Sequence, residues 1–427
     1  MELEEDLVVE NIKKFLDSEK KEVMENCYFS IMKSQSERFF KDAINVVDDI
    51  KFDSLFPLVS VVILTANKIE CDSLNYVVSR KKNGDLKKRK HSIPIFKDSY
   101  LGAPDAYIFK MHSVYILHLN AYETGSNTPG GSTDLVRFVS NNSFINPSYI
   151  ISFGICYGHN PCYQNIGDVL IPNKLYTWSV GQKIGDEGLK IKHDNFNFWL
   201  EEKFSKSGIY SILKSFCNDS DGRTIRDCIE LKKEGMKSEN KCDFSIKVVW
   251  GSMSTGEAVV SSKEAKKAIQ DATRNDKEFG GEMEGYGVAK ECIYYANIPC
   301  FIIKAICDWG VCKDIDEKLK KEKVVCPNNL KDKLQAYAAF CAAIVLFQLL
   351  NDEKEIFLSL EIIKWMSDKQ KMPKQILEDE YVDKEKIIKN IRKYYNTDGD
   401  NAARIFKIFL ENNIFIFTKG GYRINKV

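Results

Sequence analysis

The hydrophobic and polar positions along the chain change pattern near residue 58. Residues 1–50 mix Lys and Glu with spaced apolar residues, a pattern that predicts one or two peripheral helices. From Leu58 onward, β-branched runs alternate with helical stretches, which favours an α/β domain over a largely parallel or mixed central sheet. We expect strands near residues 59–65, 113–119, 149–153, 168–171, 247–250 and 299–306, and helices near 262–274 and 284–296.

An apolar run at residues 336–350 closes this large domain. The run is too short to span a bilayer and contains Gln348, so we expect a buried helix. A charged linker at 351–355 and a series of helical patterns at 356–412 follow it. The chain therefore divides into a helical extension at 1–54, a large α/β domain at 55–350 and a small C-terminal module at 355–427.

The end of this module, residues 414–424, contains two short apolar strands interrupted by Lys419, Gly420 and Gly421. A helix followed by a glycine-turned hairpin is the layout of a winged helix. Acidic and basic residues are mixed throughout the module, so a packing or oligomerisation role is favoured over nucleic-acid binding.

Composition narrows the class of protein. The chain of 427 residues is 44% hydrophobic and 29% charged, which is typical of a globular protein, and its formal net charge of +1 gives no global attraction to nucleic acid or membranes. The acidic start at residues 2–6 has no signal-peptide pattern, so we expect a cytoplasmic protein. The 13 cysteines lack paired CxxC spacing, so we expect no disulfide framework and no metal site.

Candidate chemistry lies in three separated segments of the large domain. Glu70 follows the strand at 59–65 directly and would lie at the carboxyl end of the sheet, although a Glu that opens a helix is more often a dipole partner. Glu282 and Glu284 flank a methionine before an amphipathic helix, an arrangement that suits a sugar ring and its hydroxyls. Asp308 ends a long apolar strand, where shielding from water raises the pKa of a carboxylate. Such an Asp can carry a proton.

Together and in this order, the segments resemble the nucleoside phosphorylase and methylthioadenosine nucleosidase superfamily. The resemblance covers about residues 58–350, and residues 282–308 are its most specific part. It implies a twisted mixed β-sheet flanked by helices, with the active site at the carboxyl ends of strands. The matching motifs are Ala66 with Glu70, Gly154-Ile155-Cys156-Tyr157-Gly158, Gly167-Asp168-Val169, Thr255-Gly256-Glu257, Glu282-Met283-Glu284-Gly285 and Lys304-Ala305-Ile306-Cys307-Asp308.

The resemblance also implies a role for each matching residue. Asp308 would donate a proton to purine N7, and Glu70 would position the attacking water. Glu284 would bond the ribose hydroxyls, with Met283 under the sugar. Cleavage at the anomeric carbon creates an oxocarbenium-like centre, so a proton donor and nearby carboxylates suffice, and no cofactor is expected. The remaining expected substrate-binding residues are Glu282, Gly154, Glu257 and Val259.

Hydrolysis is the expected branch of this chemistry. The phosphorolytic relatives bind phosphate with arginines near the first and third strands, whereas this chain has the anionic Glu70 at the first place and neither Arg nor Lys at 120–132. Phosphorolysis stays as the runner-up, because the glycines and hydroxyls at 125–132 form either a surface loop or a cradle for an anion.

Some positions depart from the family pattern and leave the purine unspecified. The segment Ala258-Val259-Val260 lacks the usual aromatic that stacks on the base, so stacking falls to another residue, with Trp178 and Trp309 as the candidates. Glu257 replaces the usual Asp, and Lys304 stands where Arg is common.

The basic segment at residues 80–91 bears on the 5′ substituent. It forms either a solvated face or a clamp for a 5′-phosphate chain, so the candidate substrates are adenosine-type nucleosides, methylthioadenosine, AMP and ATP. The glycine-rich form of residues 280–285, with the extra C-terminal module, resembles variants fused to other domains in prokaryotic effector systems, which implies nucleotide depletion in defence.

The expected partners are a purine nucleoside or nucleotide and further copies of the chain, with no membrane contact. Two competing functions come from other classes. One is a nucleoside sensor that binds without turnover, and the other is a DNA-binding regulator based on the hairpin-ended tail.

Overall fold

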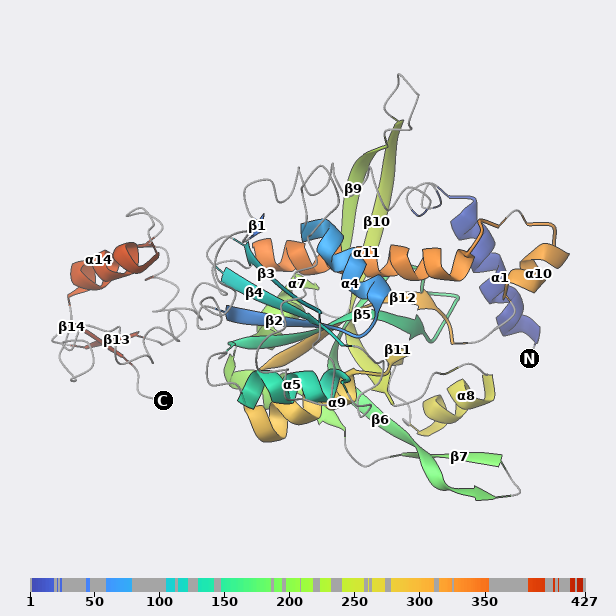
Figure 1. The fold of residues 1–427 in the computed structure, drawn as a ribbon, viewed down its shortest axis with the longest axis horizontal. Helices are drawn as coiled ribbons and strands as arrows, with labels where there is room; N and C mark the ends of the chain where they lie inside the picture. The colour runs from blue at the N-terminus through green and yellow to red at the C-terminus, as the bar shows by residue number, and fades with distance from the viewer. Residues whose placement is uncertain are drawn as a thin grey trace.

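A mixed β-sheet organises the chain, as the computed structural model in Figure 1 shows. The structure describes residues 2–18, 21, 24, 44–46, 59–78, 105–111, 114–121, 130–141, 147–185, 188–193, 197–207, 209–217, 223–231, 240–256, 260, 263–272, 278–310, 315–324, 326–352, 383–395, 402–403, 406, 415–418 and 421–424.

The sheet consists of a closed ring of strands with an open extension. The ring forms because β12 pairs with both β5 and β6, while β11 and β10 complete the path between these two strands. β2, β4, β3 and β1 extend the sheet outward from β5. The strands of ring and extension are β1 (Ile44–Val46), β2 (Val59–Thr65), β3 (Asp105–Met111), β4 (Val114–Asn120), β5 (Tyr149–Gly158), β6 (Val169–Gly185), β10 (Asn240–Thr255), β11 (Glu278–Glu282) and β12 (Cys300–Asp308), to which β7 (Gly188–His193), β8 (Phe198–Trp199) and β9 (Arg223–Leu231) are added at the edges.

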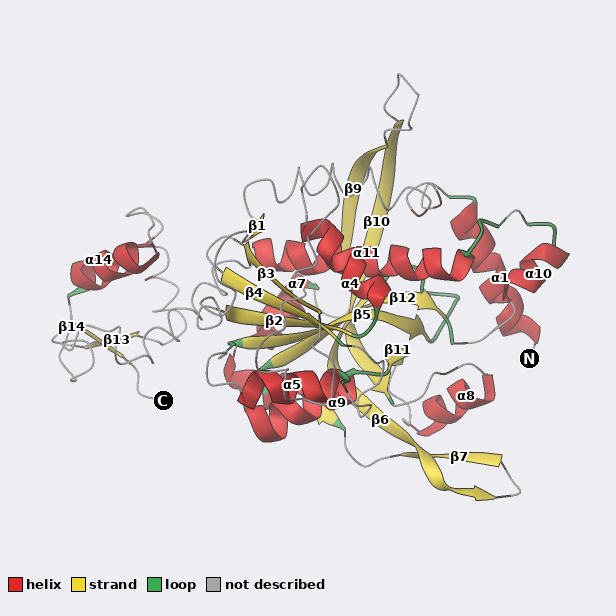
Figure 2. Ribbon diagram, in the orientation of Figure 1, coloured by secondary structure: helices red, strands yellow, loops and turns green. Residues whose placement is uncertain are grey.

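Helices cover both faces of the sheet (Figure 2). α4 (Lys68–Val78) and α11 (Leu330–Asp352) pack together on one face, and α5 (Ser132–Asn141) and α9 (Gly285–Glu291) pack together on the other. The protein thus has the fold of a mixed central β-sheet flanked by helices. The other described helices are α1 (Glu2–Leu16), α6 (Leu200–Lys203), α7 (Ile209–Phe216), α8 (Lys263–Ala272), α10 (Ile315–Lys321) and α14 (Lys384–Tyr395).

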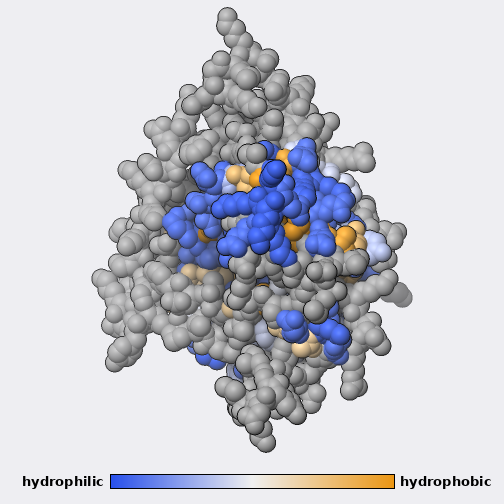
Figure 3. Space-filling model, turned by 90° about the vertical axis from the view of Figure 1, so that its right-hand side faces the viewer, coloured by the Kyte–Doolittle hydropathy of each residue, from blue (hydrophilic) through white to orange (hydrophobic). Residues whose placement is uncertain are grey.

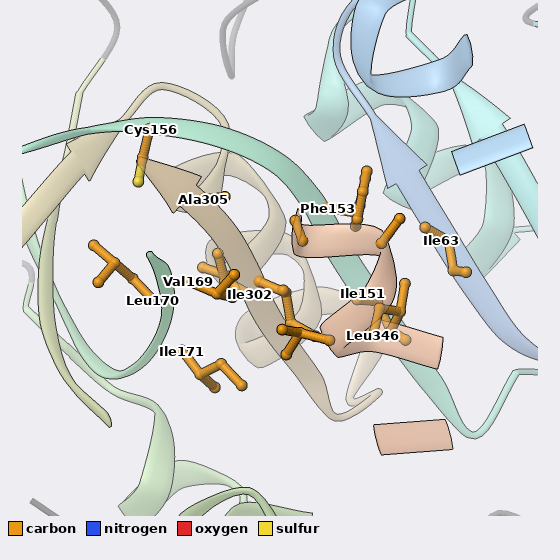
Figure 4. Packing of buried hydrophobic residues seen from close by; sticks show 14 of the residues in the cluster. Ile63, Ile151, Phe153, Cys156, Val169, Leu170, Ile171, Ile302, Ala305 and Leu346 are labelled. Carbon is orange, nitrogen blue, oxygen red and sulfur yellow. The ribbon is translucent and has the colours of Figure 1, made fainter. Parts of the chain in front are cut away.

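The hydrophobic core lies where the ring meets α11. Figure 4 shows Ile151 of β5, Ile302 of β12 and Leu346 of α11 close together, and all three residues are buried. Leu330–Asn351 is the one helix among the described residues that is long and apolar enough to cross a membrane, but 83% of its most apolar window is buried inside the protein. The expected buried helix at 336–350 is therefore confirmed.

The first helix is amphipathic. Val8, Val9, Ile12 and Phe15 of α1 are buried in the main core, whereas Glu10 and Lys14 pair on the outer side. Figure 3 views the molecule from the side on which α1 lies, and the described surface there is predominantly hydrophilic. Residues 44–46 of the expected helical extension form a strand that pairs with β3, so this segment adds to the sheet.

The strand and helix predictions for the large domain are confirmed as to place and type, whereas most of the helical patterns expected at 356–412 lie outside the described residues. The strand at 59–65 has the predicted bounds, and the helix at 262–274 appears as α8. The helix at 284–296 is α9 followed by a π-helical turn at Cys292–Ala296. β11 was not predicted, because its five residues include two glycines and show no apolar alternation. In the C-terminal module, β13 (Phe415–Thr418) pairs with β14 (Gly421–Ile424) as expected, while the winged-helix identity and the domain boundaries remain predictions.

A buried polar network joins β2, β4 and α4 beside the turn that carries Glu70. His118 is completely buried, and its ring nitrogens lie 2.9 Å from Thr65 Oγ1 and 2.9 Å from Asn75 Oδ1. Thr65 also donates a hydrogen bond to Asn120 Oδ1, 2.9 Å away. Burial lowers the pKa of His118 to about 3, so the imidazole stays neutral in the folded protein.

This burial makes stability depend on pH. The unfolded chain takes up a proton at His118 near pH 6.5 and the folded protein does not, so stability falls as pH falls below that value. We expect the free energy of unfolding to fall by about 2 kcal/mol between pH 7 and pH 5 from this residue alone. Urea denaturation of the parent and of His118→Gln at both pH values checks this. The variant should be less stable at pH 7 but should lose less stability on acidification, and equal losses in the two proteins would contradict the assignment.

Candidate active site

Glu70 is held in a fixed position at the start of α4. Its carboxylate accepts hydrogen bonds from the backbone N–H groups of Ala66 (2.8 Å), Asn67 (3.3 Å) and Ile155 (2.9 Å). Gly154 leaves the space for it, since a Cβ atom at this position would lie 2.0 Å from Glu70 Oε1. The residue therefore bridges the ends of β2 and β5 rather than serving only as a helix-dipole partner.

A turn between β11 and α9 presents Glu284. Glu282 organises this turn, because its carboxylate accepts hydrogen bonds from the backbone N–H groups of Glu284 (2.9 Å) and Gly285 (2.8 and 2.9 Å). Thr255 at the end of β10 accepts a bond from Tyr286 N (3.0 Å), and Ser132 Oγ donates to the backbone oxygen of Glu284 (3.2 Å). Met283 is partly exposed between the two glutamates.

Lys304 unites these two segments electrostatically. Its side chain is completely buried in the middle of β12, and its Nζ lies 2.9 Å from Glu284 Oε2 and 3.5 Å from Glu282 Oε2. Burial alone would lower the pKa of Lys304, but the charges of Glu284, Glu70 and Glu282 outweigh it and raise the pKa. The lysine stays protonated and compensates part of the surrounding negative charge.

The carboxylates in turn outnumber the cation. Burial is the largest cause that raises the pKa of Glu70 and of Glu282, and the charge of Glu284 raises both further. The charge of Lys304 lowers both pKa values in part. Three carboxyl groups share one ammonium in a buried volume, so ionisation of all three leaves an excess of negative charge. Such a volume favours a cationic or electron-poor group.

Asp308 stands at the end of β12 and is the exposed residue of this strand. Gly310 N donates to its Oδ1 (2.8 Å), and the Cys307 thiol lies 3.6 Å from its Oδ2. Desolvation by the surrounding protein raises the pKa of Asp308, while the hydrogen bond from Gly310 opposes the shift. Because the side chain keeps access to solvent, we expect a smaller shift than complete burial would give. A carboxyl group in this state can reach a ligand and exchange a proton.

Asp308 and the glutamate cluster belong to one region. The charges of Lys304, Glu282, Asp308 and Glu70 all act on the pKa of the buried Cys156 thiol of β5, so the four side chains lie within electrostatic range of one residue. Asp308 lies four positions after Lys304 along the strand, which corresponds to about 13 Å of strand length. β12 therefore links the buried cluster at its middle to the exposed carboxyl group at its end.

The predicted site residues therefore fall into two groups. The structure brings Glu70, Glu282 and Glu284 together around Lys304 of β12. It places Asp308 at the end of that strand. Glu257 and Val259 lie outside the described residues, as do the basic segment at 80–91 and most of the loop at 125–132.

Sequence reasoning noted Lys304 only as a departure from a family pattern and missed its position at the centre of the cluster. The signal was present, because a lysine within the apolar strand Cys300–Asp308 must find carboxylate partners to be buried. The location of those partners depends on strand pairing, which one chain segment does not reveal.

Among the described residues, no group of three or more His, Cys, Asp or Glu side chains is placed to hold a metal ion. The described cysteines, including Cys156 and Cys307, have free thiols.

Comparison with known proteins gives one family match. The model of the phosphorylase superfamily matches residues 134–346. No curated protein matches the chain. The 5′-methylthioadenosine/S-adenosylhomocysteine nucleosidase of Helicobacter pylori is similar over 69% of this chain and 99% of its own, with 15% identity and a TM-score of 0.42. The corresponding S. pneumoniae enzyme is 16% identical and has a TM-score of 0.44. The similarity covers 69% of this chain and 99% of that enzyme. Futalosine hydrolase of Helicobacter pylori is 15% identical and has a TM-score of 0.42. The similarity covers 69% of this chain and 98% of the hydrolase.

The charge balance of the cluster predicts a pH-dependent stability defect. Lys304→Met removes the cation and leaves Glu70, Glu282 and Glu284 uncompensated, so we expect a loss of about 3–5 kcal/mol at pH 8. The loss should shrink at pH 5.5, because the carboxylates then take up protons and no longer repel one another. Thermal or urea unfolding at both pH values measures it, with Lys267→Met on the exposed side of α8 as the control. A defect that is equal at the two pH values would show that the cluster is not charged.

Proposed function

The chain belongs to the phosphorylase superfamily, and from this membership we propose that it is an N-glycosidase that hydrolyses the bond between a purine base and ribose. One observation carries the proposal. Glu70 and Glu284 gather around Lys304 in the middle of β12, and the same strand ends at the exposed carboxyl group of Asp308.

Asp308 is the proposed proton donor to the leaving base. As the bond from C1′ to N9 breaks, the electron pair moves to the base, and a proton on N7 makes the base a better leaving group. The raised pKa and the solvent access of Asp308 support this role, because the protonated form persists to higher pH than in an ordinary aspartate.

The cluster is the proposed site of the sugar. Loss of the base leaves positive charge on C1′ and the ring oxygen, and the excess negative charge of the cluster stabilises it. Glu284 is placed by the turn at 282–285 to accept hydrogen bonds from ribose hydroxyls, and the partly exposed Met283 offers an apolar surface beside them.

Glu70 is the proposed partner of the attacking water. The water oxygen bonds to C1′, and its proton passes to Glu70, whose raised pKa makes it a better base than an ordinary glutamate. Three backbone hydrogen bonds fix the carboxylate, and Lys304 lies close enough to influence it. The products are free base and ribose, or ribose carrying the 5′ substituent.

Hydrolysis is favoured over phosphorolysis by the same charges. An anionic co-substrate would have to approach the excess negative charge around Glu70, Glu282 and Glu284. Lys68 in the turn after β2 is already paired with Asp72, and Lys304 is enclosed by carboxylates. The candidate substrates are adenosine-type nucleosides, methylthioadenosine, AMP and ATP. Because hydrolysis removes such a molecule irreversibly, the activity would serve a nucleotide-depleting defence effector.

A substrate panel tests the proposal. The full-length protein is incubated with adenosine, inosine, guanosine, methylthioadenosine, AMP and ATP, with and without inorganic phosphate, and free base is measured by chromatography. We expect base release without phosphate from at least one substrate. Release only with phosphate, together with ribose 1-phosphate, would establish phosphorolysis, and nucleoside binding without any release would establish a sensor.

Asp308→Asn tests the acid. Asn keeps the volume but cannot donate a carboxylic proton, so we expect kcat to fall about a hundredfold to ten-thousandfold, equivalent to roughly 3–5 kcal/mol of barrier, with little change in KM. Glu284→Gln should change KM as well, because its hydrogen bonds to ribose form before the transition state. Asp17→Asn, at an exposed position after α1, is the matched control. Unchanged base release by folded Asp308→Asn protein would remove Asp308 from the mechanism.

A further inference from the structure

A second, small hydrophobic cluster lies apart from the main core. It consists of Trp178 of β6, Val260, which precedes α8, and Ile269 of α8. Tyr157 of β5 packs against these three residues. Gly256 is required for this packing, because a Cβ atom there would lie 2.2 Å from the nearest ring atom of Trp178. The indole ring therefore lies flat against the backbone that follows β10.

This cluster borders the position of Asp308. A Cβ atom at Gly310 would lie 3.1 Å from the Tyr157 ring and 3.5 Å from Val260, so both residues contact the segment that holds the carboxylate. Gly310 N in turn donates to Asp308 Oδ1. Gly310 and Tyr157 therefore connect Asp308 to the small cluster that contains Trp178.

The polar atom of Trp178 has no partner in the part of the chain that the structure describes. Its side chain is 5% exposed, and Nε1 is buried without a hydrogen bond. An orphaned buried donor is costly, and proteins ordinarily satisfy such groups. Because indole N–H only donates, the missing partner is an acceptor. Trp309 has the same property but is packed in the main core, so Trp178 is the better placed of the two for a ligand.

We propose that Trp178 determines base specificity: its ring forms an apolar wall of the base subsite, and its N–H donates to an acceptor atom of the base. This inference rests on the proposed function, in which Asp308 lies at the base end of the substrate. The donor selects bases with a ring nitrogen or carbonyl oxygen at the facing position and disfavours a base that presents an N–H there, because two donors would then oppose each other.

A pair of variants and a set of base analogues test the inference. Trp178→Phe keeps an aromatic ring and removes the donor. Dissociation constants are measured for adenosine, 1-deazaadenosine, 3-deazaadenosine and inosine, with Asp308→Asn present in both proteins to prevent turnover. With Trp178 intact, the analogue that lacks the acceptor atom facing the indole N–H should bind about threefold to tenfold more weakly than adenosine. With Trp178→Phe, adenosine should bind more weakly by the same factor, and the analogue should bind no worse than adenosine.

The control is Trp199→Phe, whose side chain is 51% exposed on β8 and should leave the ranking of the analogues unchanged. Identical rankings with Trp178 and with Phe at this position would overturn the inference. Base release by the parent protein is independent of this result, so the inference can fail while the glycosidase activity stands. Binding without any base release by the parent would reject the activity and leave the base subsite intact.

A measurement on the unsubstituted ring covers the case in which Trp178→Phe does not fold. In Asp308→Asn protein labelled with nitrogen-15 at the indole nitrogens, adenosine should move one indole N–H resonance downfield, and the analogue that lacks the facing acceptor should not. Trp309→Phe identifies the other candidate signal. An indole spectrum that no nucleoside changes would overturn the inference.

Discussion

The site depends on the burial of one lysine among three glutamates. Lys304 occupies the middle of a central strand, where it pairs with Glu282 and Glu284, and the charge of Glu70 acts on it from the start of α4. A single buried ammonium could not remain charged there, and the glutamates could not lie so close together without it. The cluster therefore fixes the relative positions of β12, the turn at 282–285 and the start of α4.

Strand pairing makes this arrangement possible. The ring closed by the pairing of β12 with both β5 and β6 brings residues that are far apart in the sequence to one region. Two glycines adjust the packing locally. Gly154 leaves room for the Glu70 carboxylate, and Gly256 leaves room for the Trp178 ring. In both cases the absence of a Cβ atom lets a functional side chain occupy the space against the backbone.

The two ends of the region have different chemistry. The cluster end is buried and carries excess negative charge, whereas Asp308 is open to solvent at the end of the same strand. In the proposed mechanism, neighbouring charge stabilises a developing cation at one end, and the carboxyl group with a raised pKa supplies a proton at the other. This division matches the charge separation that occurs when a glycosidic bond breaks. Membership of the phosphorylase superfamily agrees with this chemistry.

The sequence by itself determined six of the central strands, the buried helix and the family, because hydrophobic periodicity and the Glu282–Asp308 motifs are local properties. It identified Glu70, Glu284 and Asp308 but gave no reason for their proximity. Only the tertiary structure decided that Lys304 compensates the glutamates, since that depends on pairing between distant strands. The orphaned indole of Trp178 was likewise invisible, because a missing hydrogen-bond partner can be recognised only when every neighbour is in place.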